Sequence, residues 1–184
     1  AVILLLAHGA DPNPATTAQG IIAQGLTALM FAAQDGKSKI ARALIRAGAR
    51  VNATAGNGFT ALMFAAHNGH TEFAAVLLRE PDLSVDQIGM NGQTALIIAS
   101  RCGNPRLVKA LLERGANPEI ALRTGHTPLL MATKNGDSKV TRILLKAGCD
   151  VNRATNTGWT ALTHSAAKGN TSLVQQLLRS GART

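Results

Sequence analysis

The sequence contains no tyrosine, and aromatic residues make up only 3% of its 184 positions, whereas hydrophobic residues make up 46%. Alanine, leucine, isoleucine and valine therefore supply nearly all of the apolar surface. Small and aliphatic side chains of this kind suit thin, closely packed pairs of helices. A chain of this length is expected to form one domain.

Cysteine is also scarce, and Cys102 and Cys149 are its two instances. Two cysteines are too few for a disulfide framework, and their separation is too long for a local metal knuckle. We therefore expect a reducing, intracellular setting, with cytoplasm, nucleus and organelle left open. The longest apolar run, residues 1–7, is too short to span a bilayer and lacks the features of a signal peptide. The sequence thus predicts no contact with a membrane.

The sequence does contain a seven-residue motif that repeats at a nearly fixed period. Residues 27–33 and 60–66 both read Thr-Ala-Leu-Met-Phe-Ala-Ala, and looser copies occupy residues 94–100, 127–133 and 160–166. The successive spacings are 33, 34, 33 and 33 residues. A fixed period of this size indicates stacked supersecondary units, none of which buries its apolar side alone.

Each unit reads Gly-x-Thr-(Ala/Pro)-Leu, then a short helix, a glycine, and a second helix that ends in Leu-Leu-x-x-Gly-Ala or a close variant. This pattern resembles the ankyrin repeat over nearly the whole chain. The resemblance implies an all-α ankyrin-repeat solenoid of helix-turn-helix units with hairpin-turn fingers, and a binding scaffold that is no enzyme. The predicted single domain, 1–184, comprises a partial repeat with a long finger, 1–24, and repeats at 25–57, 58–91, 92–124, 125–157 and 158–184.

Local signals agree with this organisation. The threonine of each motif is placed to cap the first helix, and losing one such cap should lower the free energy of unfolding by about 1 kcal/mol. Pro81 stands where other units have a glycine that closes the second helix, so we expect this helix to stop differently and its finger to differ in shape. The period predicts one buried set, consisting of Leu29, Leu44, Leu62, Leu77, Leu96, Leu111, Leu129, Leu144, Leu162 and Leu177. In the first, incomplete unit, residues 2–9 match a second helix, and residues 14–22 carry about six extra positions relative to the other fingers.

Two glycine-containing motifs point weakly to phosphate chemistry. Gly36-Lys37-Ser38 matches the end of a phosphate-binding loop, but Phe31 stands where that motif requires glycine. The segment 56–61 fits the letters of the dinucleotide fingerprint, yet no buried strand precedes it, so we interpret it as a turn.

Metal and nucleophile chemistry are also weakly indicated. His67 and His70 have a spacing that can place two imidazoles near one metal, but a glycine-containing turn separates them and no third ligand is in register. Cys102 lacks an orienting carboxylate or an oxyanion loop, so we interpret it as an inert thiol. No catalytic, cofactor or metal site is therefore predicted.

Residues that vary at a fixed register are the informative ones, because equivalent positions of stacked units form ladders. By the family resemblance, finger tips and the exposed side of the first helix form the binding surface. Large amphipathic rings would be good anchors there, although each ring could instead pack on a neighbouring finger. The predicted protein-binding residues are Leu26, Phe59, Gln93, His126 and Trp159 at the finger ends, and His67, Arg101, Lys134 and Lys168 late in the first helices.

Most of the formal charge of +9 lies elsewhere, on one face of the second helices. A solvated helix face would explain these side chains, but mixed signs serve solubility better than one sign does. An acidic partner or nucleic-acid phosphate is the functional alternative, so the rival function is a structural subunit of a large assembly, for example a ribonucleoprotein. A targeting domain attached to an enzyme is a third possibility. The basic face comprises Lys39, Arg42, Arg46, Arg106, Lys109, Lys139, Arg142 and Lys146.

Overall fold

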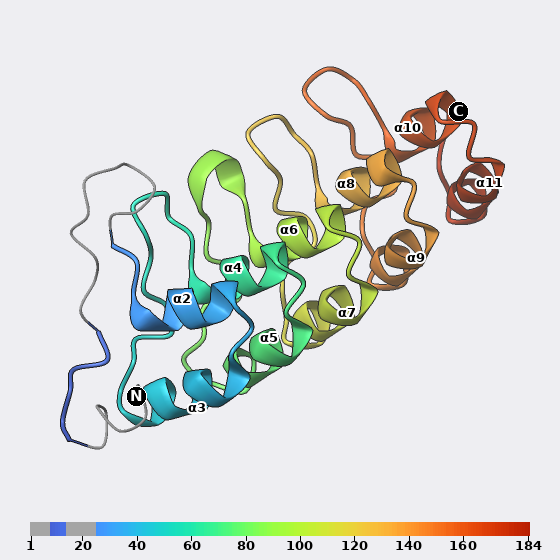
Figure 1. Ribbon diagram of the computed structural model, residues 1–184. Helices are drawn as coiled ribbons and strands as arrows, with labels where there is room; N and C mark the ends of the chain where they lie inside the picture. Colours follow the sequence, from blue (N-terminus) through green and yellow to red (C-terminus); the bar gives the residue numbers. More distant parts are fainter. Residues whose placement is uncertain (1–7, 14–24) are drawn as a thin grey trace. The chain divides into compact units, whose positions relative to one another are not determined.

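The computed structural model describes residues 8–13 and 25–184, which fold into α-helices joined by turns and hairpin-like fingers (Figure 1). These residues contain no strand, and an isolated antiparallel bridge joins Ala154 and Thr160. The all-α prediction is therefore confirmed. The predicted partial second helix at 2–9 and the long finger at 14–22 lie almost wholly outside the described residues.

The chain divides into two compact units, with the boundary between Met90 and Asn91. The single domain predicted over 1–184 stays a prediction. A short 3-10 turn, η1 (Met90–Gly92), falls at the boundary. The first unit contains α2 (Ala28–Gln34), α3 (Ser38–Arg46), α4 (Ala61–His67) and α5 (Thr71–Leu77). The second unit contains α6 (Ala95–Arg101), α7 (Pro105–Glu113), α8 (Pro128–Asn135), α9 (Ser138–Lys146), α10 (Ala161–Ala167) and α11 (Thr171–Arg179).

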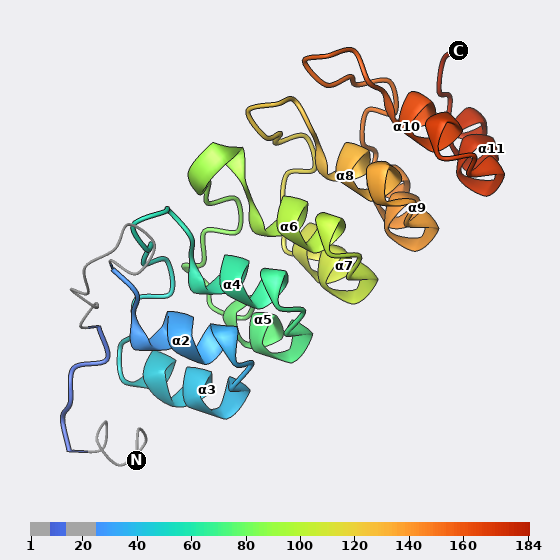
Figure 2. The same ribbon diagram turned by 45° about the horizontal axis from the view of Figure 1, so that its top comes forward.

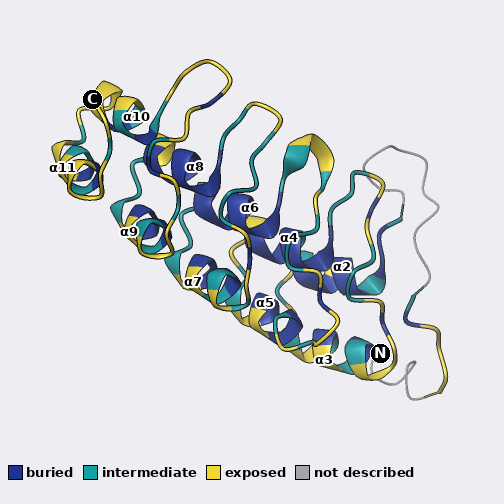
Figure 3. Cartoon of the chain, turned by 180° about the vertical axis from the view of Figure 1, so that it is seen from behind, coloured by how far each residue is buried: buried dark blue, intermediate teal, exposed yellow. Residues whose placement is uncertain are grey.

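Within each unit the helices pack as stacked pairs (Figure 2). In the first unit α2 contacts α3 and α4, while α5 contacts α3 and α4. In the second unit the first helices α6, α8 and α10 contact one another in sequence, as do the second helices α7, α9 and α11. Buried residues lie where the two rows meet, and exposed residues lie on the fingers and on the outer side of the second helices (Figure 3).

The threonine caps are confirmed at every first helix. In each case the threonine hydroxyl accepts a hydrogen bond from the backbone N–H three residues later, at 3.2 to 3.4 Å. Asparagine or aspartate caps α7, α9 and α11 in the same way, and α7 begins with Pro105. The finger before each first helix is thereby held in one position relative to that helix.

Pro81 has the predicted effect on the second helix that precedes it. Helix α5 has 7 residues, whereas α3, α7, α9 and α11 each have 9. The finger that follows contains η1, in which Asn91 takes a positive φ of 62°.

Nine of the ten leucines predicted to be buried have at most 1% of their surface exposed. Leu162 is the exception, because it is only half-buried. In the described chain α10 packs on α8 and α11, and no further first helix covers its other side. The repeat period identifies the position, but at Leu162 the extent of burial also depends on the neighbouring helices.

Thr141 is the basis of a stability prediction. Its side chain on α9 is fully buried, and its hydroxyl has no hydrogen-bond partner. The equivalent position of α7 holds Val108, which is also fully buried. Because valine has the same shape and no polar group to desolvate, Thr141→Val should raise the free energy of unfolding by about 1 kcal/mol, as measured by urea denaturation.

Thr133→Val provides the matched control. Thr133 is equally buried, but its hydroxyl donates to the carbonyls of Leu129 and Leu130, both at 3.1 Å. The same substitution should therefore destabilise the protein at this position. A Thr141→Val protein no more stable than the Thr133→Val protein would contradict the prediction.

Candidate protein-binding surface

Three rings form a row in the second unit. The indole of Trp159, at the end of a finger, stacks on the imidazole of His164 of α10, with centroids 4.9 Å apart and planes at 24°. His126, at the end of the preceding finger, lies 5.9 Å from His164 between ring centroids. Trp159 keeps 42% of its surface exposed. The row therefore presents an open aromatic surface beside α10.

The backbone fixes the outermost ring of this row. The N–H of Trp159 donates to the hydroxyl of Thr155 at 3.0 Å, and its carbonyl accepts from the N–H of Thr155 at 2.8 Å. The next residue, Thr160, then caps α10. The backbone that carries the indole is thus held between a closed turn and a helix start, and the indole itself stacks on His164. Both restraints limit the conformational entropy that would be lost on binding.

The electrostatic surroundings of the two imidazoles are positive. Burial, and secondarily the charge of Lys134, lower the pKa of His126 below its ordinary value. The pKa of His164 is lowered by burial and then by His126, Lys134 and Lys168. Both lysines are exposed. We call Trp159, His164, His126, Lys134 and Lys168 the Trp159 surface.

The first unit has a related ring contact. Phe59 at the end of a finger meets Phe64 of α4 edge to face, with centroids 5.6 Å apart and planes at 63°. Phe59 is half-buried, and His67 at the end of α4 is exposed. A side chain added at Gly89 of the next finger would come within 3.0 Å of the Phe59 ring. The predicted ring therefore packs on its own first helix and also lies close to a neighbouring finger.

The other predicted positions are less accessible than expected. Leu26 is only 8% exposed, so it offers a partner little contact area, and the adjoining backbone at Gly25 lies close to Thr54 and Ala55 of the next finger. Gln93 and Arg101 are half-buried, and the backbone carbonyl of Arg101 accepts from the side-chain amide of Asn135.

Sequence reasoning missed Phe64 and His164, which complete the two ring contacts. A signal was present, because rings recur four residues after the capping threonine at Phe31, Phe64 and His164. Phe31, at the same register of α2, is 46% exposed.

The basic face is exposed throughout. Side chains from adjacent second helices of the second unit line open grooves, of about 390 Å³ between α9 and α11 and about 430 Å³ between α7 and α9. Arg142 and Arg179 flank the first of these, and Lys109 and Lys146 flank the second. The predicted residues Lys39, Arg42, Arg46, Arg106, Lys109, Lys139, Arg142 and Lys146 are all exposed to solvent.

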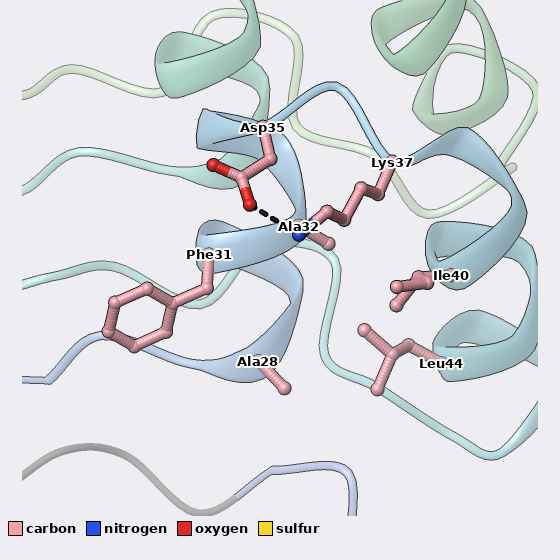
Figure 4. A pocket seen from close by; sticks show the side chains of 7 residues that line it. All are labelled: Ala28, Phe31, Ala32, Asp35, Lys37, Ile40 and Leu44. Carbon is pink, nitrogen blue, oxygen red and sulfur yellow. Dashed lines mark hydrogen bonds and ion pairs between the residues drawn. The ribbon is translucent and has the colours of Figure 1, made fainter. Parts of the chain in front are cut away.

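A separate apolar hollow of about 270 Å³ lies at α2 and α3 (Figure 4). The side chains of Ile40 and Leu44 lie on one side of it, and Lys37 pairs with Asp35 at 2.5 Å. This hydrogen bond, followed by the charge of Lys37, lowers the pKa of Asp35. Lys37 therefore already has a carboxylate partner, which argues against the phosphate-binding interpretation of the segment around it.

Two further side chains of metal-ligating or nucleophilic type, His70 and Cys149, have defined surroundings. A ring nitrogen of His70, Nε2, lies 2.9 Å from the carbonyl oxygen of Gln34, so this histidine ties two turns together. Burial raises the pKa of the Cys149 thiol to about 12, with a smaller contribution from Glu119. Within the described part of the chain, no three histidine, cysteine or acidic side chains are grouped so as to hold a metal.

Stacked helix-turn-helix units with capping threonines and projecting fingers define the class of all-α repeat proteins. The family model described as "Ankyrin repeats (3 copies)" matches residues 1–87, 29–121 and 96–184, so the chain belongs to the ankyrin repeat family. Ankyrin repeats generally mediate protein–protein interaction, and proteins built from them are typically non-catalytic. No curated protein matches the chain significantly. Within residues 8–13 and 25–184, no helix combines the length and apolar character needed to cross a membrane.

Proposed function

We propose that this protein is a non-catalytic interaction scaffold that binds a protein partner on its finger ends and first helices, in an intracellular setting and without a cofactor. The observation that carries the proposal is the half-exposed indole of Trp159, stacked on His164 and fixed at the end of a finger. Rigid aromatic side chains of this kind supply a large contact area at low entropic cost and are frequent anchors of binding energy.

Peptides selected by display against the whole 184-residue chain provide the test. Trp159→Ala should weaken peptides bound to the second unit by about 30-fold, which corresponds to about 2 kcal/mol, and Phe59→Ala should do the same for peptides bound to the first unit. Leu178→Ala is the matched control, because Leu178 is an apolar side chain of similar exposure, 44%, on α11. Circular dichroism confirms that each variant is folded.

The outcome that contradicts the proposal is equally specific. Reversing the charges at Lys139, Arg142 and Lys146 should leave the selected peptides bound within about twofold, because these residues lie on the second helix α9 rather than on a finger or a first helix. If the charge reversal abolishes binding and the Trp159 and Phe59 variants bind normally, the finger and first-helix face is not the binding surface.

A second candidate function is a structural subunit that docks in a large assembly through the basic face. The exposure of all eight predicted basic side chains favours it. Duplex DNA is a suitable probe of phosphate recognition. The charge-reversed protein should lose binding, and the logarithm of the affinity should fall with the logarithm of salt concentration by about 0.9 per phosphate neutralised. Binding that is insensitive to salt would exclude this function.

A further inference from the structure

The Trp159 surface combines stacked rings with cations that have no described counter-ion. The described ion pairs are Lys37 with Asp35, Lys109 with Glu113, and Arg153 with Glu119, and none involves Lys134 or Lys168. Besides burial, the charge of Lys134 lowers the pKa of both imidazoles, and His126 and Lys168 also lower that of His164. The surface therefore has positive charge beside an apolar ring and leaves the opposite charge to a partner.

This charge pattern indicates which chemical groups a binding partner would present to the surface. A carboxylate satisfies the lysines and an imidazolium edge, and a neighbouring apolar side chain covers the face of Trp159. We propose that the Trp159 surface binds an acidic peptide segment, in which carboxylates stand beside apolar side chains, and that the histidine pair takes up a proton on binding. The proposal rests on the proposed function and identifies the partner chemistry for the second unit.

The proton uptake follows from the position of the two rings. In the free protein, burial and the lysines disfavour a charged imidazole, and the buried Nε2 of His164 has no hydrogen-bond partner. A bound carboxylate favours the charged form instead, so it raises the histidine pKa. Because like charges disfavour each other at a ring separation of 5.9 Å, the pair should take up on the order of one proton rather than two.

The sign of the pH dependence is then fixed by linkage. The free pKa values are lowered from 6.5, and the bound values are higher, so the complex holds more protons than the free protein between the two. Affinity must therefore increase as the pH falls through this interval. A shift of one pKa unit in one imidazole corresponds to about a tenfold change in affinity.

The other charged groups around the pair do not supply this effect. Helix α8 contributes Lys134, and the C-terminal end of α10 is followed by Lys168. Helix α11 carries one charged side chain, Arg179, which lines the groove toward α9. On the neighbouring fingers Arg123 is exposed, and Arg153 pairs with Glu119 at 3.2 Å. Lysine and arginine do not titrate near neutral pH, so the histidines alone respond there.

The test uses the fluorescence of Trp159, the single tryptophan of the chain. The probe is a short blocked peptide in which glutamate alternates with leucine, and the control peptide has glutamine in place of glutamate. The glutamate peptide should bind about tenfold more tightly at about pH 5.5 than at about pH 7.5, where its carboxylates are ionised at both values. The glutamine peptide should show no comparable change.

Substitutions at His126 and His164 test whether this pair takes up the proton. His126→Gln with His164→Gln should remove the pH dependence, so that the affinity of this variant for the glutamate peptide is the same at about pH 5.5 and at about pH 7.5. His67→Gln is the control, because it removes an exposed histidine from the first unit and should preserve the dependence. Calorimetry in buffers of different ionisation enthalpy should show uptake of on the order of one proton.

The outcomes separate this inference from the proposed function. If the glutamate peptide binds equally at both pH values, or fails to bind, the inference is overturned. Sensitivity of the display-selected peptides to Trp159→Ala would still support the proposed function. If the double histidine variant keeps the pH dependence, the proton is held elsewhere and the assignment to this pair is wrong.

Discussion

Replacing Leu111 with alanine is expected to lower the free energy of unfolding by about 2 to 5 kcal/mol. Leu111 lies in α7 with none of its surface exposed, and α7 contacts both α6 and α9. Removing three buried carbon atoms loses their transfer free energy and leaves a cavity that the tightly packed helices cannot fully close. Urea denaturation followed by circular dichroism measures the loss.

Leu162→Ala removes the same three carbon atoms from another repeat and serves as the comparison. Leu162 is only half-buried, since no further first helix covers that side of α10 in the described chain. Its truncation should therefore cost clearly less than that of Leu111, because most of the cavity penalty is absent. Equal losses of unfolding free energy at the two sites would show that burial by neighbouring repeats does not control the stability of this core.

The second large effect is expected at Gly125, where a finger turns beside its neighbour. Gly125 has a φ of +81°, and a Cβ added there would lie 2.8 Å from the backbone nitrogen of Asn156. That nitrogen donates to the carbonyl of Thr124 at 3.1 Å, so the added carbon would separate two bonded fingers. Gly125→Ala should therefore combine the cost of a left-handed backbone with that of overpacking, about 2 to 4 kcal/mol in total.

Gly158→Ala isolates the first of these costs, that of the left-handed backbone. Gly158 occupies the same place in the next finger with the same φ of +81°, but an added Cβ would meet nothing within 4 Å. It should cost about 1 to 2 kcal/mol, from backbone conformation alone. Denaturation of both variants gives the difference, and a difference near zero would mean that the contact between the fingers contributes nothing to stability.

The Gly125 contact also affects the candidate binding surface. His126 follows Gly125 directly, and Trp159 lies in the finger that contains Asn156. The side-chain amide of Asn156 donates to the carbonyl of Arg123 at 2.8 Å, which adds a second bond between these fingers. Displacing one finger should therefore disturb the spacing of the ring row, and the fluorescence of Trp159 in the Gly125→Ala protein should differ from that of the Gly158→Ala protein.

The sequence by itself determined the class of fold and the placement of its helices. Each repeat specifies its helix boundaries locally, because a capping threonine starts the first helix and Pro81 shortens one second helix. These effects act within a few residues of the chain. The leucine positions followed as well, since each recurs at the same place relative to a cap.

The tertiary structure decided which of these positions is covered, and by what. Leu26 and Leu162 occupy the same registers as residues that differ from them in exposure, because burial depends on the neighbouring finger or helix rather than on the period. The contacts of Phe59 with Phe64 and of Trp159 with His164 likewise arise where a finger folds back over its own helix. The period marks a position within a repeat, whereas the contacts and the charge at that position are set by side chains that differ from repeat to repeat.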